Sequence, residues 1–243
     1  MKTIHVALSI LPVVALLAGC NVNKDISVPA RAHWSSGSST INGEISVGAG
    51  AIVNGGLRTI NGSISVASNA QVGDLTTING TITLSNGVRA GELKGVNATI
   101  TLGKQVVTDG TVESVNGGIQ AASGSRIQGD VRDVNGDITL CDTQVTGSLA
   151  FYNGTVQVAQ KSVVQGDITA KKPNGSEYNR EYNREPILIV GPGANVGGTI
   201  SFERPGELYV SDSAVVHAVQ GATPIKFSGA APAKLPTPDC PNT

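Results

Sequence analysis

Aromatic side chains are scarce in this sequence, at 3% of 243 residues, and there is a single tryptophan. Globular cores rely heavily on such large side chains, so one thick core is not expected here. Charge is also low: Asp, Glu, Lys and Arg make up 14% of the chain, and the formal net charge is −1. This balance offers no basic surface to nucleic acid. Glycine, by contrast, occurs 31 times, which suits many thin, similar layers.

Residues that commonly carry catalysis are few. Beyond the N-terminal segment the only histidines are His33 and His217, and no Gly-x-Ser-x-Gly, His-Glu-x-x-His or phosphate-loop motif occurs. Acidic residues are scattered, apart from Asp130, Asp133 and Asp137, and the polar corners of a repeat protein need such residues anyway. We therefore expect no enzymatic activity and no catalytic residue.

Metal ligands are equally sparse. Cys141 and Cys240 have no further Cys or His at ligand spacing, and the glycine-aspartate nonapeptide of calcium-binding repeats is absent. We expect no metal site and no dissociable cofactor.

The N-terminus carries an export signal. The apolar run "VALSILPVVALLA" is too short to span a bilayer and has the length of a secretory signal. It ends in "LAGC", residues 17–20, which resembles the lipobox of bacterial lipoproteins. The resemblance implies that residues 1–19 are removed and that Cys20 carries a diacylglycerol and an N-acyl chain, leaving residues 20–22 as the lipidated N-terminus. The alternative is an ordinary secretory peptide.

The lipoprotein resemblance also predicts a location. Asn21, rather than Asp, follows the lipidated cysteine, which in this class favours an outer membrane lipoprotein of the cell envelope, facing the periplasm. The membrane would then be the first partner, held through the lipid. Such a compartment is oxidising, so Cys141 and Cys240 could pair, although the sequence alone does not bring them together.

An asparagine recurs at steps of 18 or 19 residues along most of the chain. Three residues after each asparagine comes an apolar row, and a second apolar row follows two residues later, with polar residues between them. The asparagines are Asn23, Asn42, Asn61, Asn79, Asn97, Asn116, Asn135 and Asn153, and the first apolar row is Ile26, Ile45, Ile64, Ile82, Ile100, Ile119, Ile138 and Val156.

The two rows predict the fold. Their period-two alternation indicates strands with one face buried. An antiparallel meander with Asn-Gly hairpins would place different phases of the repeat opposite each other. Parallel stacking places each residue on its equivalent, and this like-on-like contact favours keeping the same residue along a row.

We therefore predict an all-β, single-stranded parallel β-helix over residues 23–229, of about 9–10 rungs of 18–19 residues. A right-handed coil is favoured by the rule for parallel crossovers. Each rung also carries an apolar-x-Gly-x-apolar motif, such as "VNGGL" from Val53, which we interpret as a second strand.

One insertion and one tail interrupt the pattern. Residues 171–186 contain "EYNREYNR", and Tyr178, Arg180, Tyr182 and Arg184 form a candidate interaction loop because Tyr and Arg are enriched at interface hot spots. A plain solvated loop is the alternative. Residues 230–243 form a Pro- and Ala-rich tail that reads as extended and poorly ordered.

The repeat phrase "x-I/V-N-G-x-I-x-V/L" resembles two bacterial β-solenoid families over about residues 22–221: the bactofilins and the putative-adhesin solenoids. Bactofilins are cytoplasmic polymer-forming scaffolds, and this chain departs from them in its export signal and lipobox. The resemblance implies a non-enzymatic structural or adhesive protein, with possible self-association through the solenoid ends or with another envelope component. The alternative is an envelope β-helix that binds or degrades carbohydrate.

Overall fold

The computed structural model describes residues 21–173 and 184–240. Residues 1–20, with the predicted signal peptide and lipidation site Cys20, lie outside the described residues, as do Tyr178, Arg180 and Tyr182. Within the described part there is no helix, about 51% of residues are in strands, and the strands form one parallel β-solenoid of about ten turns. The predicted fold class is confirmed. At about 4.8 Å per turn, the rod is roughly 45–50 Å long.

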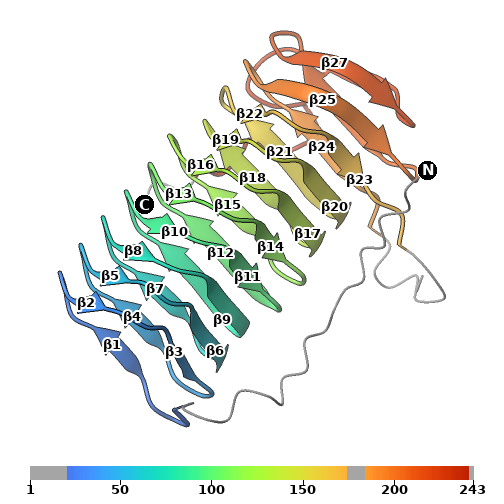
Figure 1. Cartoon of the computed structure of the whole chain (residues 1–243). Coiled ribbons are helices and arrows are strands. Elements are labelled where there is room, and N and C mark those ends of the chain that lie inside the picture. The colour runs from blue at the N-terminus through green and yellow to red at the C-terminus, as the bar shows by residue number, and fades with distance from the viewer. Residues whose placement is uncertain (1–20, 174–183, 241–243) are drawn as a thin grey trace, which may run out of the picture.

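Each turn presents three faces, and Figure 1 shows the turns stacked in chain order from the blue end to the red end. The strands of the first face are β1 (Ile26–Val28), β4 (Ile45–Val47), β7 (Ile64–Val66), the second half of β9 (Leu75–Leu84), β12 (Ala98–Leu102), β15 (Ile119–Ala121), β18 (Ile138–Cys141), β21 (Thr155–Ala159), β24 (Ile187–Val190), β26 (Glu207–Ser211) and β28 (Pro224–Phe227).

The other two faces consist of shorter strands. The second face has β2 (His33–Trp34), β5 (Ile52–Val53), β8 (Gln71–Val72), β10 (Arg89–Ala90), β13 (Val107–Thr108), β16 (Arg126–Ile127), β19 (Gln144–Val145), β22 (Val163–Val164) and the first halves of β25 (Asn195–Phe202) and β27 (Val215–Gln220). The third has β3 (Ser38–Thr40), β6 (Leu57–Asn61), the first half of β9, β11 (Leu93–Gly95), β14 (Val112–Ser114), β17 (Val131–Asn135), β20 (Leu149–Asn153), β23 (Ile168–Ala170) and the second halves of β25 and β27.

The register follows the sequence repeat. Ile64 pairs with Ile82, which pairs in turn with Ile100, and all three side chains are fully buried. The Asn79-Gly80 pair lies inside the continuous strand β9, which is parallel to its neighbours on both the first and the third face. This dipeptide is therefore a corner of the coil rather than a hairpin turn.

The apolar-x-Gly-x-apolar motif is also a corner in most turns, which corrects its interpretation as a second strand. Val53 ends β5 and Leu57 begins β6, so the motif joins the second face to the third. Glycine is required there by close approach of successive turns: a Cβ on Gly37 would lie 2.0 Å from the carbonyl oxygen of Gly56. Only in β25 does one strand run through the motif, with a register shift between Val196 and Thr199.

The C-terminal tail is tied to the rod. Residues 228–240 contain no strand, and Cys240 forms a disulfide with Cys141 of β18, 99 residues earlier, with their Cα atoms 5.8 Å apart. The tail therefore starts from the last turn and returns to the middle of the solenoid. No helix among the described residues is long and apolar enough to cross a membrane.

Candidate functional site

The asparagine row forms a continuous ladder along the corner between the third and first faces. Each Nδ2 donates to the Oδ1 of the asparagine one turn earlier, beginning with Asn42 to Asn23 at 2.7 Å. The same bond then joins Asn61 to Asn42, Asn79 to Asn61, Asn97 to Asn79, Asn116 to Asn97, Asn135 to Asn116 and Asn153 to Asn135. All eight predicted asparagines take part, so all these side-chain carbonyls point toward the C-terminal end.

The buried guanidinium of Arg204 terminates this ladder. Its Nη2 donates to the Oδ1 of Asn153 at 2.8 Å, and to the backbone oxygens of Tyr152 and Arg184, each at 2.6 Å. A cation is favoured at this end because the aligned amides present their oxygens to it. Through the Arg184 carbonyl, Arg204 also fixes the point at which the insertion rejoins the rod.

Aspartates at the corners are bonded to the backbone of the next turn. Asp137 Oδ1, for example, accepts the backbone N–H of Thr155 at 2.7 Å. The same bond is made by Asp25 to Glu44, Asp74 to Glu92, Asp130 to Ser148 and Asp167 to Thr199, at 2.7–2.9 Å. These carboxylates satisfy corner N–H groups that no strand partner reaches, which gives them a structural role.

On the third face, four hydroxyl residues point inward, each two positions before a ladder asparagine in the sequence. Each donates to a backbone carbonyl of the preceding turn: Thr40 to Lys24, Thr59 to Gly43, Thr77 to Gly62 and Ser114 to Ala98, at 2.8–2.9 Å. These four side chains are buried, so the row satisfies carbonyls at the inner side of the corner.

Asp133 takes the same position one turn after Ser114, with which it pairs in register. It is 1% exposed, and neither carboxyl oxygen has a hydrogen-bond partner of good geometry. Burial raises the pKa of Asp133 to about 8, against smaller lowering effects of the Gly136 amide and the Ser114 hydroxyl and a small raising effect of Asp137. The carboxyl is therefore neutral at pH 7 and carries a proton, as the row's hydroxyls do.

The same region has a polar groove on the first face, with a volume of about 440 Å³. It lies over β12, β15 and β18, beside the ladder. Its lining consists of Thr99, Asn116, Gly117, Gly118, Gln120, Asn135, Gly136, Asp137, Thr139 and Arg184. Arg184 is thus the one member of the predicted interaction loop that the structure places, and it lies at this groove.

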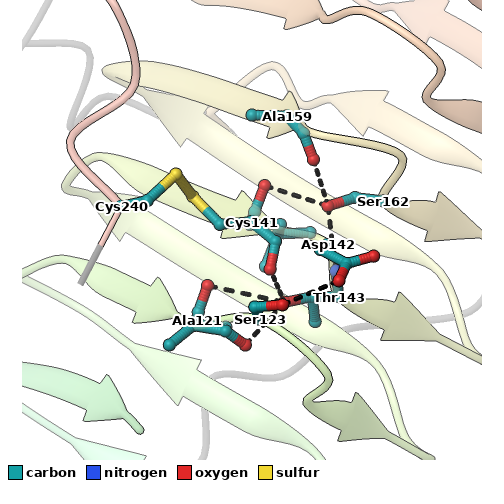
Figure 2. Close-up of a disulfide and its surroundings, with 10 residues drawn as sticks. Ala121, Ser123, Cys141, Asp142, Thr143, Ala159, Ser162 and Cys240 are labelled. Atoms are coloured by element: carbon teal, nitrogen blue, oxygen red, sulfur yellow. Dashed lines mark hydrogen bonds between the residues drawn. A yellow bond between two sulfur atoms is a disulfide. The ribbon is translucent and has the colours of Figure 1, made fainter. Parts of the chain in front are cut away.

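Figure 2 shows the disulfide and the hydroxyl network beneath it. The Oγ1 of Thr143 donates to the Cys141 carbonyl at 3.0 Å, and the Oγ of Ser162 donates to the Ala159 carbonyl at 2.5 Å, with the Leu140 carbonyl at 3.0 Å. Ser162 Oγ also accepts the backbone N–H of Thr143 at 3.1 Å. Buried hydroxyls therefore hold the turn that presents Cys141 to the tail.

The remaining candidate groups do not assemble. His33 is exposed on β2, with its Nε2 3.3 Å from the Asn54 amide, whereas His217 is exposed on β27 near the other end of the rod. No group of three or more His, Cys, Asp or Glu in the described ranges could hold a metal ion.

Three residues that matter in this region, Arg204, Asp133 and Gly118, were assigned no site role from the sequence. Arg204 has no periodic signal that would place it on the ladder. Asp133 and Gly118 could have been found by aligning the repeats. Asp133 is a carboxyl in a row of hydroxyls, and Gly118 is a glycine in a row of polar side chains.

No family model, no curated protein and no solved structure matches this chain.

Proposed function

We propose that the protein is a non-enzymatic, lipid-anchored rod of the bacterial cell envelope with a structural or adhesive role. One observation carries the proposal: the ladder asparagines and five corner aspartates are used to bond one turn to the next. The Asp137 carboxylate holds the backbone of Thr155, and the Asn79 amide bonds to Asn61 and Asn97. Such a molecule is suited to bearing load or spacing partners, because these bonds tie each turn to the next along the rod.

The anchor is proposed at Cys20, from the "LAGC" motif. The solenoid supports it, because the first described residues after this position already belong to the coil. Asn21 forms a parallel bridge with Thr40, and Asn23 accepts the first ladder bond. A lipid on Cys20 would therefore place the first turn against the membrane surface without a tether, with the rod projecting from it.

Detergent partitioning tests the anchor. Wild-type protein expressed with its own signal should partition into the detergent phase, and the Cys20→Ala variant should stay in the aqueous phase with an unchanged β-type circular dichroism spectrum. The matched control is the Cys141→Ala, Cys240→Ala double variant, which loses the disulfide but keeps Cys20 and should still partition. Retention of Cys20→Ala in the detergent phase would disprove the anchor.

Reducing-sugar release tests the claim that the rod is not an enzyme, since carbohydrate degradation is the main alternative. The Cys20→Ala protein should release no reducing ends from peptidoglycan or from neutral and acidic polysaccharides. Release that disappears in Asp137→Asn would contradict the proposal and would assign a catalytic role to that carboxylate.

Self-association through the rod ends is proposed as the way in which such rods could build a larger structure. The last turn supports it: among the described residues β27 pairs only with β25 and β28 only with β26, and Val215 and Ile225 are each 48% exposed there. Unpaired strand edges are templates for further pairing. Sedimentation velocity of Cys20→Ala over a concentration series should show growing species, and a strictly monomeric protein would remove this part of the proposal.

A further inference from the structure

One outward row of the first face has a gap in it. The residue just before the buried isoleucine is Asp25, Glu44, Ser63, Thr81 and Thr99 in successive turns, then Gly118, then Asp137 and Thr155. Thr99 and Asp137 are two turns apart, about 9–10 Å along the rod. Between them the surface lacks a side chain, and the polar groove lies at this position.

We propose that this groove is a binding site for an uncharged, polyhydroxylated ligand, a sugar unit of a glycan. The proposal deepens the adhesive half of the proposed function by naming what the rod would adhere to. The volume of about 440 Å³ lies within the roughly 300–1,000 Å³ of small-molecule sites.

The walls of the groove offer paired donors and acceptors. In the ladder, Asn116 and Asn135 each use one Nδ2 hydrogen and one lone pair of Oδ1 within the rod. A primary amide has two hydrogens and two lone pairs, so each retains one donor and one acceptor. Thr99, Gln120 and Thr139 add two hydroxyls and a third amide to the lining. A sugar hydroxyl both donates and accepts, which matches this set.

The charges of the lining balance. Asp137 supplies one carboxylate, whose Oδ1 accepts from the Thr155 backbone, and Arg184 supplies one guanidinium. All the other lining residues are uncharged, and none has a large apolar side chain. A neutral ligand is therefore favoured over an anion or a cation, and hydrogen bonding over apolar contact.

The position of Arg184, near the end of the insertion, supports the same site. Arg184 lines the groove although it precedes β24, and β24 pairs with β21, beyond the groove's own strands. Its backbone carbonyl is held at 2.6 Å by the buried Arg204. Insertions in solenoids commonly lie on the binding face, and the end of this one is fixed beside the gap.

Titration calorimetry of the Cys20→Ala protein with chitohexaose, cellohexaose and maltohexaose tests the site. We expect at least one of these neutral oligosaccharides to bind. In the same background, Gly118→Thr restores the side chain that Thr99 provides one turn earlier, and should weaken binding at least tenfold. Its Cβ would meet the Asp137 backbone oxygen at 3.0 Å, so the backbone must shift by a few tenths of an ångström, and the stability of Gly118→Ala measures whether it does.

The matched control is Ser46→Thr, which enlarges an outward side chain of the first face four turns away and should leave affinity unchanged. Arg184→Ala should weaken binding without altering the circular dichroism spectrum. No binding of any of the three probes, or equal binding by wild type and Gly118→Thr, would overturn the proposal. Either result would leave the proposed anchor unaffected, because detergent partitioning tests the anchor separately.

Discussion

The guanidinium of Arg204 donates to the side-chain oxygen of Asn153, 51 residues earlier in the chain, at 2.8 Å. The same guanidinium donates to the Arg184 carbonyl, so Arg204 joins two features that the sequence keeps apart, the end of the asparagine ladder and the return of the insertion. It also explains why the ladder stops at Asn153: in the next turn of the first face, the residue before β24 is part of the insertion, and an arginine replaces the missing amide.

Replacing Arg204 with Met should destabilise the rod by about 2–3 kcal/mol, because three buried or half-buried acceptors lose a charged donor. Denaturant unfolding measures the loss, and limited proteolysis should show faster cleavage near residue 184. Arg132→Met is the control: Arg132 forms an exposed ion pair with Asp130, and such pairs contribute about 0–1 kcal/mol. Equal effects of the two substitutions would refute the role assigned to Arg204.

Asp133 should make stability depend on pH. Its folded pKa, about 8, lies above the ordinary value of 3.8, so between these values the folded chain keeps a proton that the unfolded chain releases. Stability should therefore fall as pH rises from about 4 to 8, with a slope approaching 1.4 kcal/mol per pH unit, and level off above that range. Thermal unfolding across this range measures the slope.

Asp133→Thr gives the row the hydroxyl found at Thr59 and Thr77, and should raise the melting temperature at pH 8 while changing it little below pH 4. Asp109→Asn is the control, since Asp109 is exposed and pairs with Arg89 at 2.8 Å. A pH slope that persists in Asp133→Thr would show that another group causes it.

The fold was largely predictable because stacking repeats the same chemistry in every turn. Ile64, Ile82 and Ile100 have equivalent neighbours, so the row itself revealed the register. The strands of the second face were not separated from those of the third in the apolar-x-Gly-x-apolar motif, because strands such as β5, Ile52–Val53, are too short to show alternation. Arg204 and the partner of Cys240 could not be placed, because the insertion and the tail have no period that fixes where they meet the rod.

Removing the disulfide should loosen the C-terminal half. The Cys141→Ala, Cys240→Ala variant should lose about 2–4 kcal/mol, the usual contribution of a bridge that closes a long loop. Wild type in reducing agent should match it, which separates loss of the bond from an effect of alanine at the buried Cys141. Amide hydrogen exchange should rise mainly in residues 228–240 and in β27 and β28. Unchanged exchange there would mean that the tail is held by other contacts.

Each hydrogen bond of the ladder should contribute to the free energy of unfolding of the rod. Asn79→Ala removes two side-chain bonds, to Asn61 at 2.8 Å and from Asn97 at 3.0 Å, and should cost about 1–2 kcal/mol. Thr83 lies on an outward row of the same turn and makes no ladder bond. Thr83→Ala should therefore lose well under half of the stability that Asn79→Ala loses. Equal losses in denaturant unfolding would show that the ladder adds nothing beyond strand propensity.

Two glycines of neighbouring turns should respond very differently to alanine. A Cβ on Gly136 would lie 1.3 Å from the backbone oxygen of Gly117, whereas one on Gly118 would lie no closer than 3.0 Å to the Asp137 backbone oxygen. The first clash involves backbone and cannot be relieved by rotating a side chain. Gly136→Ala must therefore separate two turns at the ladder corner.

We expect Gly136→Ala to lose more than about 3 kcal/mol or to fail to fold, and Gly118→Ala to stay within about 1 kcal/mol of wild type. Denaturant unfolding of both variants in the Cys20→Ala background measures the difference. If Gly136→Ala were as stable as Gly118→Ala, the turns could not be as closely stacked at this corner as the register requires. The comparison also establishes whether position 118 accepts the side chain used to block the groove.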